Sequence, residues 1–257
     1  MEKANDVILE LQERVSDLVE YDDRFQEAFY LYFWLKVRNF NVDSTEKYIR
    51  ETVQWLQENK AQAAVEQDYD PELYKCFSVY TTARTRTGFA AYQSYAGRFR
   101  FGETISKFGK KAVVHYWLQI LSKAENLLVE YNREAQEFHG TSVSSWPLSK
   151  KSVLIMNMKH CQYSEFLSKD TISVFVTLVK MAVNYFPAIE GTLIFINAGR
   201  MMEFFFKLIQ PIMKGSNIEL QVFGCKEEKW RPAIQEYCDP DEIMTAFGGN
   251  VEGPVDP

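Results

Sequence analysis

Apolar residues near the start of the chain recur at helical spacing. In VILELQERVSDLV, residues such as Ile8 and Leu11 fall on one side of a helix. Asp43 or Ser44 is placed to cap a second amphipathic helix that follows. The pattern therefore predicts that residues 6–60 are helical throughout.

After residue 70 the pattern changes to strands that alternate with helices. The expected strands are residues 76–82, 89–96, 151–158, 193–197 and 219–224, and the expected helices are residues 110–138, 171–186 and 200–213. The last three strands are short, nearly continuous apolar runs, which is typical of strands buried on both faces. This alternation predicts an α/β fold with a mixed sheet of about five strands flanked by helices.

The same change of pattern divides the chain. We expect a small N-terminal helical domain over residues 1–70, a larger α/β domain over residues 71–250, and a C-terminal tail over residues 251–257. Pro71 follows a polar stretch and marks the first boundary. We find no internal repeat and no low-complexity tract.

The expected helix at residues 200–213 is unusually apolar. Its polar residues Arg200, Glu203, Lys207 and Gln210 fall in one narrow stripe. The remaining apolar arc, rich in Met and Phe, is about twice as wide as the stripe of roughly 100° that a surface helix needs. Three interpretations fit this pattern: a helix buried in the core, a helix that binds a partner's helix, or a helix that covers an apolar cavity.

Composition and charge narrow the class of partner. The 257 residues are 46% hydrophobic and 25% charged, as in an ordinary globular protein, and the net charge is −6. Nucleic acid is a poor partner for such a chain, because phosphate binding needs clustered basic residues. Residues 1–70 contain 16 acidic and 8 basic residues.

A basic segment follows the acidic region. It contains one acid, Glu103, and seven basic residues: Arg84, Arg86, Arg98, Arg100, Lys107, Lys110 and Lys111. One interpretation is an ordinary solvated surface. The other is a surface that transiently contacts an anionic membrane, to which each basic residue contributes about 1 kcal/mol.

The sequence shows no sign of catalysis or of a metal site. Its four cysteines and three histidines are scattered, without the spacing of a zinc site or a disulfide framework. It lacks a phosphate-binding loop, a dinucleotide fingerprint and a nucleophile elbow. Cys161 follows His160 directly, but sequence neighbours rarely face each other as catalysis requires. We therefore expect no enzyme activity, no cofactor and no metal.

The N-terminus and the longest apolar region bear on localisation. The first residues are charged and lack the apolar core of a signal peptide. The apolar region over residues 171–196 is interrupted by polar residues, so we do not expect it to span a membrane. A cytoplasmic location is expected, and no sequence feature defines the oligomeric state.

Three blocks of this sequence resemble the CRAL-TRIO lipid-binding family. WLKVRNFNVDS is similar to a signature of that family's small helical domain. NYFPAIEGTLIFINAGRMMEFFFKLIQPIM is similar to its NYPE block, its strand ending in INAP and its gate helix. FGCKEEKWRPAIQEYCDPDEIMTAFGG is similar to its closing block. Order and spacing match from about Val7 to Gly249.

The resemblance implies an α/β pocket that holds one hydrophobic molecule under a gate helix, here residues 200–213. The gate helix would touch the bound lipid when closed and the membrane when open. The residues that we expect to contact ligand or membrane are Phe204, Phe205, Phe206, Leu208, Ile209 and Met213, with Phe175, Val179 and Phe195 lining the pocket. The implied function is lipid binding and transfer between membranes, with transient peripheral membrane contact.

Several family positions are changed in this chain. The acid of the NYPE block is replaced by Ala188, and a lysine that acts with it in phosphoinositide-binding members is replaced by Glu219. The turn around Gly88 is shortened, a strand ends in Asn157 instead of Asp, and EYGG has become AFGG. These changes argue against phosphatidylinositol and favour a less polar ligand, such as a sterol precursor or a tocopherol-like or retinoid-like molecule.

Two other hypotheses remain open. The first is a protein-interaction module with a vestigial pocket, which the changed signature positions favour. The second is an enzyme acting on a lipid ester, for which the sequence offers no recognisable nucleophile.

Overall fold

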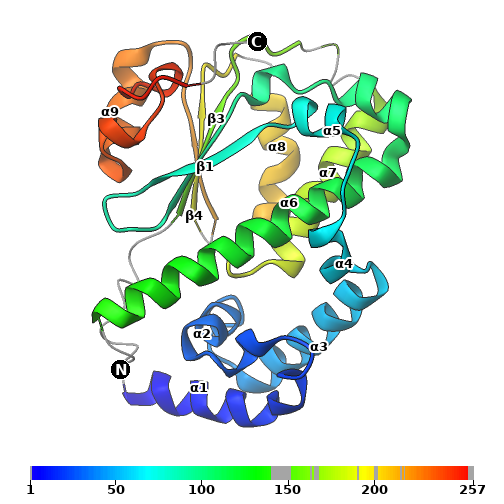
Figure 1. Cartoon of the computed structure of the whole chain (residues 1–257), viewed down its shortest axis with the longest axis vertical. Coiled ribbons are helices and arrows are strands. Elements are labelled where there is room, and N and C mark those ends of the chain that lie inside the picture. The colour runs from blue at the N-terminus through cyan, green and yellow to red at the C-terminus, as the bar shows by residue number, and fades with distance from the viewer. Residues whose placement is uncertain are drawn as a thin grey trace.

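The computed structural model describes residues 2–139, 152–162, 164, 168–189, 191–199, 202–214, 216 and 218–253. The chain begins with four helices: α1 (Glu2–Arg14), α2 (Ala28–Lys36), α3 (Val42–Glu58) and α4 (Ala61–Glu66). Of these, α1, α2 and α3 gather at one end of the molecule (Figure 1). The predicted helical start of the chain is thus present, with 3-10 turns between α1 and α2.

An asparagine caps α3. The side chain of Asn41 accepts a hydrogen bond from the backbone N–H of Ser44 at 2.8 Å, while Asn41 itself has an extended backbone. Our prediction placed this cap at Asp43 or Ser44 and was wrong by two or three residues. Both of those residues already lie inside the helix.

Strands and helices alternate after α4, as predicted. The elements in order are α5 (Pro71–Cys76), β1 (Val79–Arg84), β2 (Ala90–Ser94), α6 (Phe101–His139), β3 (Ser152–Asn157), α7 (Lys169–Tyr185), β4 (Gly191–Ile196), α8 (Met202–Met213), β5 (Ile218–Val222) and α9 (Glu227–Tyr237). The strands form one five-stranded sheet in chain order. β1 and β2 are antiparallel and the other neighbouring pairs are parallel, so the sheet is mixed.

Three element predictions need correction. Cys76 ends a helix and does not begin a strand, because Asp70 caps α5 and Pro71 occupies its first turn. α6 begins at Phe101, nine residues before the predicted start, and its helical backbone is interrupted at Gly109 (φ 81°, ψ 154°). β5 is an edge strand and not a doubly buried one, since Glu219 and Val222 on it are exposed.

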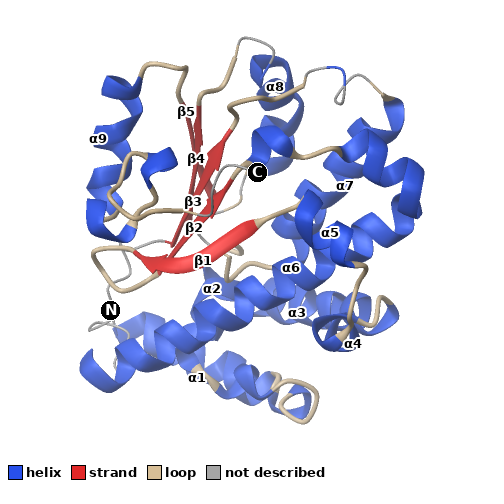
Figure 2. Ribbon diagram, turned by 45° about the horizontal axis from the view of Figure 1, so that its top comes forward, coloured by secondary structure: helices blue, strands red, loops and turns tan. Residues whose placement is uncertain are grey.

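Helices cover both faces of the sheet. α9 lies against one face, while α6, α7 and α8 lie on the other, as the two views agree (Figures 1 and 2). α6 runs between the N-terminal helices and the sheet (Figure 1). The N-terminal helices form their own hydrophobic cluster, to which α6 contributes Val129. Ala61 and Ala64 of α4, in contrast, belong to the larger cluster beside the sheet. The predicted domain boundary at residue 70 stays a prediction.

Candidate functional site

The two faces of the sheet are buried to different degrees. Under α9 the aliphatic side chains of the central strands are completely buried, each 0% exposed: Val153, Ile155, Ile194 and Ile196. On the face under α6, α7 and α8, four aliphatic side chains are only half-buried, namely Leu154, Met156, Leu193 and Leu220, while Phe195 of the same face is 4% exposed. Helices packed tightly on a sheet would bury both sets alike. The helices on the second face therefore pack less tightly around these four side chains.

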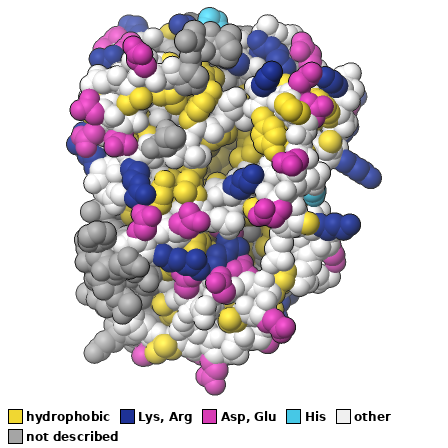
Figure 3. Space-filling model, in the orientation of Figure 1, with side chains coloured by type: hydrophobic (Ala, Val, Ile, Leu, Met, Phe, Trp, Pro, Cys, Tyr) yellow, Lys and Arg dark blue, Asp and Glu magenta, His cyan; other side chains and the backbone are white. Residues whose placement is uncertain are grey.

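A hollow is also visible from outside. On the face drawn in Figure 3, hydrophobic side chains gather at the bottom of a hollow. Its position corresponds to the space between the sheet and α8 in the same orientation (Figure 1). We take this apolar space, bounded by the sheet, α6, α7 and α8, as the candidate functional site.

One side of α8 is buried, and half-buried residues lie to either side of it. Met202, Phe205 and Ile209 are buried, at helical spacing along one side. Phe206 and Leu208, on neighbouring positions, are half-buried. The side of the helix that carries Lys207 and Gln210 is exposed, in agreement with the predicted polar stripe. The structural description does not extend to the side chains of Arg200 and Glu203.

Aromatic rings connect α8 to its surroundings. The Phe205 ring packs edge-on against Phe175 of α7, with 6.0 Å between ring centroids, and Phe175 in turn lies 6.5 Å from Phe101 at the start of α6. The Phe206 ring packs against Phe195 of β4 at 4.8 Å. Edge-to-face ring pairs of this kind contribute about 0.5–1.5 kcal/mol each beyond the burial of their surface.

The predicted ligand-contact residues lie on α7, β4 and α8, and contact with a ligand stays a prediction for each of them. Phe175, Phe195, Phe205 and Phe206 lie in one hydrophobic cluster. Ile209 is buried on the same helix as Phe205. The others are half-buried on α7 or α8: Val179, Leu208 and Met213. The side chain of Phe204 lies outside the described residues.

Sequence reasoning missed the contribution of α6. Trp117, Ile120 and Leu121 are half-buried and pack against the same cluster as Phe205. Their spacing of three and four residues is a helical signal, but α6 also packs against the N-terminal helices. Because α6 carries apolar residues on two sides, the sequence does not tell which side faces the sheet.

The changed family positions lie away from the apolar space. Ala188 is buried in the cluster of the N-terminal helices. Glu219 is exposed on β5, where its carboxylate accepts a hydrogen bond from Gln221 at 3.1 Å. Asn157 connects two loops through hydrogen bonds. Its side-chain N–H donates to the backbone carbonyl of Ala246 at 2.9 Å, and its side-chain oxygen accepts from the side-chain N–H of Asn197 at 2.9 Å.

The seven basic residues do not form one surface. Arg84 pairs with Glu134 near the end of α6 at 2.9 Å, and Arg86 pairs with Asp239 after α9. Lys110 lies at the other end of α6, on the order of 35 Å from Glu134 at a rise of about 1.5 Å per residue. It pairs with Asp170 at 2.6 Å.

The remaining basic residues lie near the start of α6. Lys107 pairs with Glu72, Lys111 is exposed, and Arg98 and Arg100 are half-buried. The Arg98 guanidinium lies over the Tyr95 ring at 4.7 Å. A membrane-facing role for any of these residues stays a prediction.

Two cysteines are poor candidates for a nucleophile. Burial raises the pKa of the Cys161 thiol to about 11 and that of Cys238 to about 12, whereas a reactive cysteine needs a lowered value. Within the described residues, no group of histidine, cysteine and carboxylate side chains could hold a metal ion. The described helices also include none that is long and apolar enough to cross a membrane.

A buried charged pair at the opposite face of α6 was also missed. Glu125 is 2% exposed and contacts Arg24, which lies 101 residues earlier. The one signal in the sequence was the position of Glu125, a charged residue on the side of α6 that also carries Val129. No sequence pattern identifies a partner at that separation.

Comparisons with known proteins place these features in context. A model of the CRAL/TRIO domain family matches residues 105–249, more than half of the chain. A protein described as Sfh5, known from a crystal structure, shares the fold with a TM-score of 0.71 at 12% sequence identity. That match covers 99% of this chain and 89% of the other. The search of curated proteins found no match.

Proposed function

The chain belongs to the CRAL/TRIO domain family, and on that basis we propose that it binds one small hydrophobic lipid and carries it between membranes. Proteins of this family bind lipophilic molecules and act in lipid binding or transfer rather than as enzymes. The lipid would occupy the apolar space between the sheet and α6, α7 and α8. In this proposal α8 is the closing helix, and catalysis has no part.

The observation that supports this proposal is the difference between the two faces of the sheet. Leu154, Met156 and Leu193 are half-buried on central strands that helices cover, whereas their neighbours under α9 are fully closed off. Apolar contact at about 25 cal/mol per Å² would hold a long hydrocarbon chain there without a charged anchor.

The ligand that we propose is not phosphatidylinositol. Ala188 has no charge to offer an inositol headgroup, and Glu219 is exposed on the edge strand. A carboxylate at that position repels a phosphate. A less polar molecule, such as a sterol precursor or a tocopherol-like or retinoid-like compound, suits the apolar surroundings better.

Membrane contact is proposed only for the start of α6. Lys107, Lys110 and Lys111 are exposed there, where Lys107 also pairs with Glu72 and Lys110 with Asp170. Arg84 and Arg86 lie toward the other end of that helix, in ion pairs with Glu134 and Asp239. Each exposed lysine near an anionic surface contributes about 1 kcal/mol at most, so this contact would be transient.

Lipid capture from a membrane extract tests the proposal. The purified protein is mixed with a total membrane extract and re-isolated, and bound lipid is identified by mass spectrometry. We expect one lipid class at close to one molecule per chain. An empty protein that instead retains a defined protein partner would favour the interaction module and overturn lipid transfer.

A further inference from the structure

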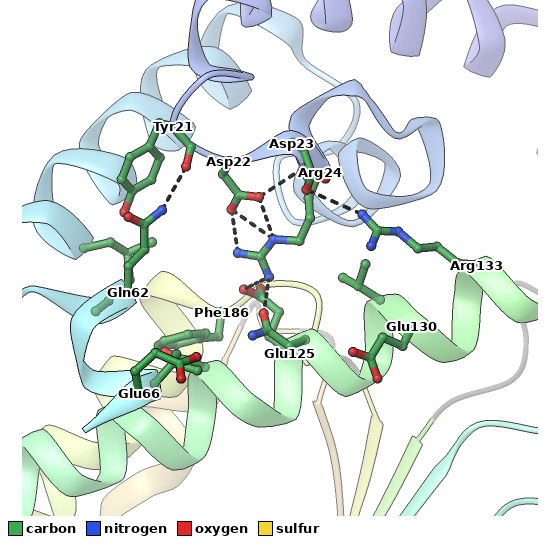
Figure 4. A pocket seen from close by; sticks show the side chains of 16 residues that line it. Tyr21, Asp22, Asp23, Arg24, Gln62, Glu66, Glu125, Glu130, Arg133 and Phe186 are labelled. Carbon is green, nitrogen blue, oxygen red and sulfur yellow. Dashed lines mark hydrogen bonds and ion pairs between the residues drawn. The ribbon is translucent and has the colours of Figure 1, made fainter. Parts of the chain in front are cut away.

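A second cavity lies between the N-terminal helices and α6. Its volume is about 440 Å³, and its lining includes Arg24, Glu125, Glu130, Arg133 and Phe186. Figure 4 shows Arg24 reaching from the N-terminal part of the chain toward Glu125 of α6, with Phe186, which follows α7, nearby. The cavity therefore marks the contact between the two parts of the molecule.

Arg24 is the centre of this contact. Its guanidinium binds Asp22 through two nitrogens, at 2.8 Å from Nε to Oδ1 and 2.5 Å from Nη2 to Oδ2. Nη1 donates to Glu125 Oε2 at 3.0 Å and to Asn126 Oδ1 at 3.1 Å. One side chain from the N-terminal helices is thus joined to two residues of α6 (Figure 4).

The cluster contains one more negative charge than positive. One guanidinium faces two carboxylates, and the Glu125 side chain is 3% exposed. Its Oε1 atom is buried and has no hydrogen-bond partner among the described residues. A buried carboxylate that Arg24 contacts through only one oxygen is costly when ionised, although the nearby Tyr30 hydroxyl favours the ionised form.

Among the described residues, no other group that faces Glu125 supplies the missing positive charge. The charged and titratable residues that surround Glu125 are Asp22 and Asp23 before α2, Tyr30 on α2, Tyr48 on α3, Glu66 on α4, and Glu130 and Arg133 on α6. Arg133 is itself paired with Glu27 and with Asp23. Burial raises the pKa of Glu125 to about 7 even though the attraction of Arg24 opposes that rise. Tyr30, fully buried, has a pKa well above 10 and remains neutral.

We propose that docking of the N-terminal helices on α6 is coupled to protonation, with Glu125 binding a proton when the contact closes. The protonated cluster is neutral, since Asp22 and Arg24 balance each other. The ionised cluster leaves one net negative charge in a site that water barely reaches. Closing the contact is therefore easier for the protonated form.

The pH window follows from the two states of Glu125. Separated from Arg24 and exposed to water, its carboxyl has the ordinary pKa of 4.5, and in the closed contact the pKa is about 7. Because the closed state binds the proton more tightly, closure is strongest below about pH 4.5 and weakens as the pH rises toward 7. The closing equilibrium changes by a factor on the order of 10² across this range.

A second contact holds α3 in place, so that only the segment around Arg24 would separate from α6. The Tyr48 hydroxyl donates to the backbone carbonyl of Asn184 at 2.5 Å, and the Trp55 and Tyr185 rings stack at 3.8 Å. Burial raises the pKa of Tyr48 to about 12, so these contacts between α3 and the end of α7 do not titrate near neutral pH. We expect α3 to stay attached while the segment around Arg24 separates from α6.

An anionic membrane would act on such a contact. A surface potential of about −30 mV concentrates protons roughly threefold. That change falls within the range over which Glu125 titrates. The N-terminal helices would close more tightly on α6 at the membrane than in bulk solution. This inference does not require that a lipid is bound.

Hydrogen exchange measured by mass spectrometry tests the proposal. Peptides covering residues 16–36 and 122–133 are compared at pH 5.5, 7.0 and 8.5, as protection factors corrected for intrinsic exchange. We expect protection to fall at least tenfold from the lowest to the highest pH, while the peptide from α3 changes little. Protection that is independent of pH at residues 16–36 would overturn the proposal.

Two variants assign the effect to one carboxyl. Glu125→Gln keeps the shape and is neutral at every pH, so its protection should be high and independent of pH. Glu130→Gln removes an exposed carboxyl of the same helix and cavity, and should keep the wild-type pH dependence. The same pH dependence in Glu125→Gln as in the wild type would contradict the assignment.

A direct titration covers the case in which Glu125→Gln does not fold. The carboxyl carbon of Glu125 in the wild-type chain is followed by NMR between pH 4 and pH 9. A titration midpoint near 7 supports the proposal. A midpoint near the ordinary value of 4.5 would overturn it.

Discussion

Phe195 of β4 and Phe206 of α8 form an edge-to-face ring pair with centroids 4.8 Å apart. The preceding residue, Phe205, turns instead toward Phe175 of α7. Phe205 is 1% exposed, whereas Phe206 is half-buried beside the apolar space. Two adjacent phenylalanines on one helix therefore have different surroundings, and their substitutions should separate lipid transfer from stability.

Phe206→Asp should impair lipid transfer while the chain still folds. A carboxylate beside the apolar space would have to lose water when a lipid enters, at a cost of several kcal/mol. We expect transfer of a fluorescent hydrophobic lipid between vesicles to fall by about tenfold or more. Gln210→Asp adds the same charge on the exposed side of α8 and is the control. Equal transfer by both variants would contradict a lipid site at Phe206.

Phe205→Ala should act mainly on stability. Removing a fully buried phenylalanine ring costs about 3–5 kcal/mol in the free energy of unfolding, because the cavity it leaves collapses only partly. Urea unfolding followed by circular dichroism measures this loss. A cost below about 1 kcal/mol would show that Phe205 faces open space and not the packed contact with Phe175.

Gly109→Ala should destabilise the protein. The backbone at Gly109 has φ 81° and ψ 154°, a conformation that residues with a side chain rarely adopt. We expect a cost of about 1–3 kcal/mol, even though nothing lies within 4 Å of an added Cβ atom. Ser106→Ala, at an exposed position of the same helix, should have little effect. Thermal unfolding of the two variants side by side gives the comparison.

Lys110→Ala with Lys111→Ala should weaken binding to anionic vesicles. The loss of two positive charges at the membrane corresponds to about 2 kcal/mol, or roughly thirtyfold in affinity at low salt. Arg84→Ala with Arg86→Ala removes the same charge at the other end of α6 and should have a smaller effect. Co-sedimentation with anionic vesicles at several salt concentrations measures both. Binding that does not weaken with salt would exclude an electrostatic contact.

Local patterns predicted most of the fold. The apolar runs that became β3 and β4 are recognisable because both strands lie in the middle of the sheet. The same reasoning failed for β5, because an apolar run does not reveal that a strand lies at an edge where Glu219 is exposed. The start of α6 was missed because Gly109 interrupts the helical pattern eight residues after Phe101.

The candidate site was predictable in part. The wide apolar arc of α8 follows directly from the spacing of its polar residues, but that spacing does not separate Phe205 and Phe206 from the other apolar residues of the arc. The side of α6 that faces the sheet, with Trp117, could not be separated from the side that faces the N-terminal helices. The contact between Arg24 and Glu125 depends on chain segments that only the tertiary fold brings together.

Because α6 lies between two hydrophobic clusters, the chain cannot be divided into two independently folded parts at residue 70 without exposing core residues. A shorter chain that began at residue 71 would lose α4, and with it Ala61 and Ala64 from the larger cluster. It would also leave Val129 of α6 without the helices that cover it, and Glu125 without Arg24. The N-terminal helices are therefore not an exchangeable module. A graft onto another scaffold, or a swap between relatives, would have to include the matching face of α6.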